Sequence, residues 1–223
     1  MEVIASDLIS WQEKNGSWAY PGGHGDLSCT QFAILGLNAA TKVGIQVPAQ
    51  VWRDAIAGIL LFGAQFDATS HLGTDTIKRT ITGFKYRPNY TSGGTLSMTT
   101  AAIASIAVCL KQLGGKYPQK TRKEIKRTVA EGMAWINHNF TVARNYGFSS
   151  HHFYTLYGIE RVGVAYGSHL GEHDWYNNGA TFLIDAQNQD GHWDNDSHLT
   201  DTAFALIFLK RAPAAAAVTG GKQ

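Results

Sequence analysis

Two kinds of helical segment alternate along the chain. The stretch 120–140 places apolar side chains at intervals of three and four, with Lys, Arg and Glu between them, which is typical of a helix with one face in water. The stretches 96–110 and 202–209 are apolar or small nearly all round, which indicates helices enclosed on most sides. The pattern predicts half-solvated outer helices and enclosed inner helices. The outer helices are expected at about 3–13, 49–65, 120–139 and 173–187, and the inner ones at about 27–42, 96–113, 151–165 and 200–211.

A short repeat joins outer to inner helices. The pattern Q-x-x-[N/D]-G-x-W occurs at 12–18 and again at 187–193, each time between an amphipathic stretch and a Thr-bearing apolar one. The inner helices begin near residues 28, 97, 151 and 200, and a period near 50 residues is typical of an array of helical hairpins. The motif glycine suits a left-handed helix end. We interpret six motif residues as structural staples rather than catalysts: Gln12, Gly16, Trp18, Gln187, Gly191 and Trp193.

The composition indicates one globular domain. Of the 223 residues, 44% are hydrophobic and 16% charged, which excludes disorder for the body of the chain. We expect a single domain over 1–211 and a disordered tail over 212–223. A net charge of +2 gives no electrostatic footprint for nucleic acid. Neither a membrane-spanning stretch nor a signal peptide is visible, so the default expectation for the compartment is the cytoplasm.

The two full repeats resemble the QW motifs of terpenoid cyclases and protein prenyltransferases. Within that superfamily the sequence is most similar to bacterial squalene-cyclase-like proteins with prenyltransferase and squalene-oxidase repeats, over the segments 26–37, 157–164, 173–176 and 201–211. The resemblance implies an all-α fold, an α/α toroid in which inner helices surround a central cavity. A complete toroid has six hairpins and this chain shows four. It therefore implies an incomplete or open ring, the C-terminal portion of a toroid, with a missing N-terminal part or a protein partner at the exposed edge.

The catalytic motifs of that superfamily are not found in the sequence. Squalene-hopene cyclases protonate an alkene with an aspartate of D-x-D-D, which does not occur here. Protein prenyltransferases bind zinc through D-x-C, and the matching place reads Asp26-Leu27-Ser28, so a hydroxyl replaces the thiolate. We therefore expect no metal ion and no cofactor, and whether the chain is an enzyme stays open.

His24 and Asp26 are the candidate catalytic pair. They lie in a Gly-rich loop before an inner helix, where a carboxylate and an imidazole can move a proton. The favoured alternative is structural, because the Asp26 carboxylate can cap the free amides of the helix that follows. Asp201 has a similar place before another inner helix, which supports a repeated structural role.

His151 and His152 begin a further inner helix. Imidazoles with aromatic neighbours can stabilise a cation, but adjacent helical residues point about 100° apart. We therefore expect one of the two to cap the helix or face solvent.

The inner helices are expected to line a cavity for an apolar, isoprenoid- or lipid-like molecule. The candidate binding residues are Phe32, His151, His152, Phe153, Tyr154, Tyr157 and Phe204. Two other hypotheses stay open. One is an active cyclase or transferase that uses Asp26 and His24, and the other is a protein-interaction scaffold that uses an exposed edge.

Overall fold

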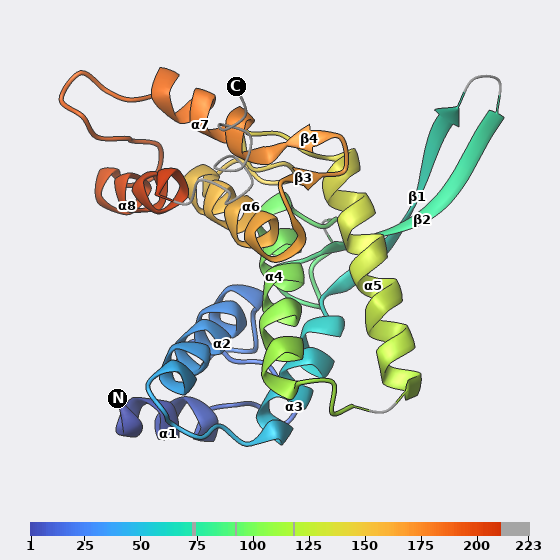
Figure 1. Cartoon of the computed structure of the whole chain (residues 1–223), viewed down its shortest axis with the longest axis vertical. Helices are drawn as coiled ribbons and strands as arrows, with labels where there is room; N and C mark the ends of the chain where they lie inside the picture. The colour runs from blue at the N-terminus through green and yellow to red at the C-terminus, as the bar shows by residue number, and fades with distance from the viewer. Residues whose placement is uncertain (73–74, 92, 118, 211–223) are drawn as a thin grey trace, which may run out of the picture.

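Three enclosed helices and a half-exposed fourth pack one after another. The fourth, α8, was also expected to be enclosed, but it buries Asp201, Ala205 and Phe208 and leaves Leu199 and Leu206 exposed, because it lies at the end of the series. The computed structural model describes residues 1–72, 75–91, 93–117 and 119–210. Helix α4 packs against α2 on one side and α6 on the other, and α6 packs against α8 (Figure 1). Thirteen of the 18 residues of α4 are buried, because its small and apolar side chains leave no polar stripe for water. The bounds of the four are Leu27–Lys42 (α2), Leu96–Leu113 (α4), His152–Tyr166 (α6) and His198–Leu209 (α8).

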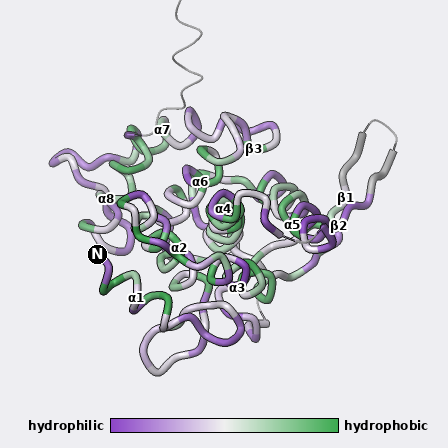
Figure 2. Tube along the Cα trace, turned by 60° about the horizontal axis from the view of Figure 1, so that its bottom comes forward, coloured by the Kyte–Doolittle hydropathy of each residue, from purple (hydrophilic) through white to green (hydrophobic). Residues whose placement is uncertain are grey.

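Four further helices cover the enclosed ones from outside. Helix α1 packs on α2, α3 and α5 pack on α4, and α7 packs on α6. In Figure 2, α4 lies at the centre with the other helices around it and hydrophilic loops on the periphery. The alternation of outer and inner helices therefore follows the predicted order. The outer bounds are Glu2–Ser10 (α1), Ala49–Leu60 (α3), Gln119–His138 (α5) and Trp175–Asp185 (α7).

The fold departs from the expected all-α class in two segments, of which the first is the longer. The predicted outer helix 49–65 ends at Leu60, and the chain then forms two antiparallel strands, β1 (Gly63–Leu72) and β2 (Asp75–Phe84), that project beyond the helices (Figure 1). The stretch 76–82 is rich in Thr and Ile, and β-branched side chains favour a pleated strand over a helix.

A second, smaller sheet lies just before α7. It pairs β3 (His169–Leu170) with β4 (His173–Asp174), so the predicted outer helix 173–187 begins two residues late, at Trp175. Asp174 caps α7 by accepting a hydrogen bond from the Asn177 amide at 3.1 Å. The fold is therefore mainly helical, 56% of it by residue, with two small sheets. The predicted tail 212–223 lies outside the described residues.

Candidate functional site

The first Q-x-x-N-G-x-W motif joins α1 to α2 through side chain to backbone hydrogen bonds. Gln12 Nε2 donates to the Gly16 carbonyl at 3.1 Å. The indole N–H of the buried Trp18 donates to the Leu8 carbonyl at 2.7 Å, and the Trp18 amide donates to Thr30 Oγ1 at 3.0 Å. Trp18 thus links the end of the outer helix, through its indole, to the first turn of the inner helix, through its backbone amide.

The second motif repeats these bonds between α7 and α8. Gln187 Nε2 donates to the Gly191 carbonyl at 2.8 Å. The Trp193 indole donates to the Leu183 carbonyl at 2.7 Å, and the Trp193 amide donates to Thr202 Oγ1 at 3.0 Å. Both motif glycines have φ of +91°, a conformation that favours glycine. The two motifs are therefore one structural joint used twice.

Four of the candidate binding residues form one aromatic surface. Phe32 on α2 stacks with Tyr154 on α6, with ring centroids 6.0 Å apart, and Phe204 on α8 lies 5.7 Å from Tyr154 and 5.2 Å from Tyr157. Phe32 is 47% exposed, whereas Tyr157 is buried. Three inner helices thus bring their rings together, and the α2 side of this surface faces solvent.

Polar groups lie at the buried side of the aromatic surface. The Tyr154 hydroxyl donates to Gln31 Oε1, and the Gln31 Nε2 atom is buried with no hydrogen-bond partner among the described residues. Burial raises the pKa of Tyr154, so this hydroxyl stays protonated. The Arg161 guanidinium lies 5.2 Å from the Tyr157 ring centroid and forms an ion pair with the buried Glu160. The surface therefore combines apolar rings with a few fixed hydrogen-bonding groups.

Asp26 acts as a helix cap, and His24 does not join it. Asp26 is fully buried at the N-cap of α2, where its Oδ1 accepts a hydrogen bond from the Cys29 amide at 2.7 Å. His24 is exposed, and within the described ranges no hydrogen bond or ion pair links it to Asp26. The geometry favours the structural role of Asp26 over the catalytic pair.

The second oxygen of Asp26 influences its neighbours electrostatically. Asp26 Oδ2 is buried, and the carboxylate lies beside the Cys29 thiol and the Tyr86 hydroxyl. Burial first, and then the charge of Asp26, raises the pKa of the Cys29 thiol to about 11 and also raises the pKa of Tyr86. Cys29 is therefore protonated at neutral pH, which makes it a poor nucleophile and a poor metal ligand.

Asp201 has a structural role that differs from that of Asp26. It lies within the first turn of α8, whose N-cap is Ser197. Its Oδ2 accepts three backbone hydrogen bonds, from the amides of residues 195, 196 and 197, at 2.8 to 2.9 Å. The expected parallel between the two aspartates therefore holds for burial and backbone bonding, but not for position.

His151 and His152 face different surroundings, as the angle between adjacent residues predicts. His151 precedes α6 with φ of +63°, and its exposed ring has Nδ1 3.5 Å from Asp196 Oδ2. His152 is buried against Phe153 and Phe182, with Nε2 2.7 Å from the Val142 carbonyl oxygen. Burial lowers the pKa of His152, so the ring is neutral. His152 and Phe153 are core residues of α6, and none of the ring contacts of His151 or His152 reaches the aromatic surface.

The sequence reasoning missed a cavity at the base of the β-hairpin. This cavity of about 320 Å³ lies between β1, the end of α5 and the loops around residues 93 and 146. Its aromatic lining consists of Phe66, Trp135 and Tyr146, with Trp135 and Tyr146 edge to face at 5.8 Å. These residues come from three distant segments with no shared motif, so no local signal marks them.

The comparisons with known proteins add no relative. No family model, no curated protein and no solved structure matches this chain. In the part of the chain that the structure describes, no group of three or more His, Cys, Asp or Glu is placed to hold a metal ion. Helix α4 alone among the described helices is long and apolar enough to span a membrane, and most of it is buried inside the fold.

Proposed function

We propose that this chain is part of an α/α toroid related to terpenoid cyclases and protein prenyltransferases, and that it binds an isoprenoid- or lipid-like apolar molecule. The order of packing of α2, α4, α6 and α8, with outer helices on the first three, supports the toroid. The duplicated joint supports the relationship, because the same three bonds recur at both motifs.

The observation that carries the ligand proposal is the aromatic surface. Phe32, Tyr154 and Phe204 come from three separate inner helices and meet with ring centroids 5.7 to 6.0 Å apart. Phe32 leaves nearly half of its surface open to solvent. Large rings supply apolar contact area for a ligand at low conformational cost, and a buried hydroxyl such as that of Tyr154 can orient a polar end.

Titration calorimetry with farnesol tests the proposal. We expect measurable heat with the wild-type chain and about tenfold weaker binding for Phe32→Ala, because loss of roughly 55 Å² of apolar contact costs about 1.4 kcal/mol at about 25 cal/mol per Å². Phe148→Ala is the matched control, since Phe148 is similarly exposed (52%) but packs against His151. Absence of heat with farnesol and with squalene analogues, or equal losses in the two variants, overturns the proposal.

The catalytic alternative has a separate test. It needs an acid, and the only candidate pair is Asp26 with His24, of which Asp26 is held by the cap of α2. Incubation of squalene with the protein should give no cyclic product. Formation of product that Asp26→Asn abolishes would instead show catalysis at this residue, because asparagine keeps the cap but not the acid.

A further inference from the structure

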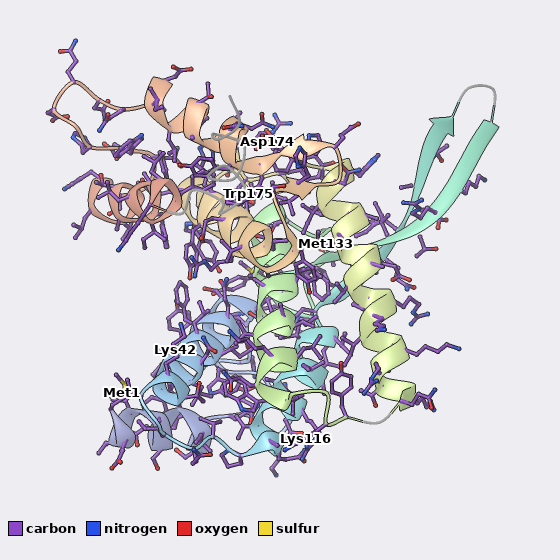
Figure 3. The ribbon with its side chains drawn as sticks, viewed as in Figure 1. Met1, Lys42, Lys116, Met133, Asp174 and Trp175 are labelled. Atoms are coloured by element: carbon purple, nitrogen blue, oxygen red, sulfur yellow. The ribbon has the colours of Figure 1, made fainter. Side chains whose placement is uncertain are left out.

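The cavity at the base of the β-hairpin is a concave site separate from the aromatic surface. Its volume of about 320 Å³ is at the small end of the range for ligand pockets, so it suits a small molecule rather than a long apolar chain. It lies where the hairpin packs against α5, on the stretch of that helix that Met133 marks in Figure 3. None of its described lining residues belongs to the aromatic surface.

Three aromatic side chains line the cavity, and each comes from a different segment. Phe66 is half-buried on β1 and pairs across the hairpin with Ile81, which also lines the cavity. Trp135 lies on α5 and is only 3% exposed, and Tyr146 lies edge to face with it from the loop before α6. The face of an aromatic ring carries partial negative charge, so several rings around one cavity attract a cation.

Packing of the backbone holds these rings in place. The buried Asn145 accepts a hydrogen bond from the Ser97 amide at 3.1 Å, which fixes the loop that carries Tyr146 to the start of α4. A Cβ on Gly83 would lie 2.6 Å from Trp135 Nε1, so β2 packs directly against the indole ring. The walls are therefore set before a ligand binds, which lowers the entropic cost of binding.

The charge of the lining favours a cation over an anion. The described lining residues include one carboxylate, that of the exposed Asp67, and no lysine or arginine. Arg79 on β2 and Arg144 in the loop before α6 are exposed and lie outside the lining. The cavity thus offers negative charge and aromatic faces to a ligand, and no cation to pair with a phosphate or a carboxylate.

Two polar groups of the lining have hydrogen-bonding capacity to spare. In the part of the chain that the structure describes, the Trp135 indole N–H has no hydrogen-bond acceptor, whereas the indoles of Trp175 and Trp193 each donate to a backbone carbonyl. Asn139 Nδ2 donates to the Trp135 carbonyl at 2.9 Å, and its Oδ1 accepts no hydrogen bond from the described residues. A hydroxyl group on a ligand therefore has both a donor and an acceptor available here.

We propose that this cavity binds a small quaternary alkylammonium cation that carries a hydroxyl group, of which choline is the simplest. The ammonium group contacts the aromatic rings, and the hydroxyl group hydrogen-bonds with Trp135 and Asn139. Cation–π attraction is strongest where the rings are shielded from water, as they are between the hairpin and α5. The site shares no residue with the aromatic surface, so binding here does not depend on the isoprenoid ligand proposed above.

A nuclear magnetic resonance titration of the wild-type chain tests the inference with a matched pair of ligands. Choline is compared with its neutral carbon analogue, in which a tert-butyl group replaces the trimethylammonium group, so the shape and the hydroxyl group are kept and the charge is lost. The nitrogen–proton signal of the Trp135 indole, assigned with Trp135→Phe, reports binding in this cavity. We expect choline to shift this signal to saturation and the neutral analogue to bind about tenfold more weakly or worse.

A pair of variants then tests the aromatic contact itself. Tyr146→Leu keeps an apolar side chain but removes the π face, so choline should bind about fivefold more weakly and the neutral analogue about as before. Tyr90→Leu is the matched control, since Tyr90 is similarly exposed (43% against 39%) but does not line the cavity.

Three results overturn the inference: equal binding of the two ligands, equal effects of the two variants, or an indole signal that choline does not move. The comparison of ligands uses the wild-type chain, so it decides the matter even where a variant fails to fold. Circular dichroism of each variant shows whether its helices are intact.

Discussion

The two motif glycines provide a matched pair for measuring what an outer neighbour contributes. Gly16 and Gly191 have the same φ of +91°, so alanine at either position carries the same backbone cost, about 1 to 2 kcal/mol. At Gly191 this is nearly the whole effect, because the added Cβ meets no atom closer than 3.9 Å. At Gly16 the Cβ would lie 1.8 Å from the Asp54 carbonyl oxygen, so α3 must move.

Displacement of a packed helix adds about 1 to 3 kcal/mol of overpacking cost. We therefore expect Gly191→Ala to lower the free energy of unfolding by about 1 to 2 kcal/mol and Gly16→Ala to lower it by about 2 to 5 kcal/mol. Urea unfolding followed by far-ultraviolet circular dichroism, at low protein concentration, measures both. Equal losses in the two variants would refute the reasoning that a neighbouring helix packs closely against Gly16 but that none of the described residues packs closely against Gly191.

Three further predictions concern single side chains. His152 is neutral in the fold because burial lowers its pKa, so protonation favours the unfolded chain. The free energy of unfolding should therefore fall as the pH drops below about 6.5, and it should fall less in His152→Gln. Urea unfolding at pH 7 and at pH 5 measures both. Asp26→Ala should cost about 1 kcal/mol of unfolding free energy and Asp26→Asn much less, and equal losses would contradict the cap. Cys29, with a pKa raised to about 11, should react with iodoacetamide about tenfold more slowly than a free cysteine at pH 7.5, and mass spectrometry would reveal a faster reaction.

The helices were predictable because burial of one face leaves a 3.6-residue periodicity, and burial of nearly all faces leaves a long run of apolar and small residues. The stretches 27–42 and 96–113 coincide with α2 and α4, since capping residues stand just before each of them: Asp26 for α2 and Thr95 for α4. The hairpin 63–84 was missed because its strands share one sheet only with each other, so their pattern is set by local β-propensity rather than by a core face.

The candidate site was predictable only in part. Residues at the starts of inner helices were expected to meet, and Phe32, Tyr154 and Phe204 do meet. Sequence could not say which of two adjacent histidines is buried, because that depends on how far α6 is rotated about its axis. Nor could it find the cavity beside Trp135, whose walls come together only where the hairpin packs, through β2, against α5.

A crystal structure of the chain with farnesol tests the central claim most directly. The account predicts electron density for the isoprenoid chain against Phe32, Tyr154 and Phe204, with its hydroxyl toward Gln31. Density elsewhere, for example in the cavity beside Trp135, or an aromatic surface that stays empty at saturating farnesol, would contradict it.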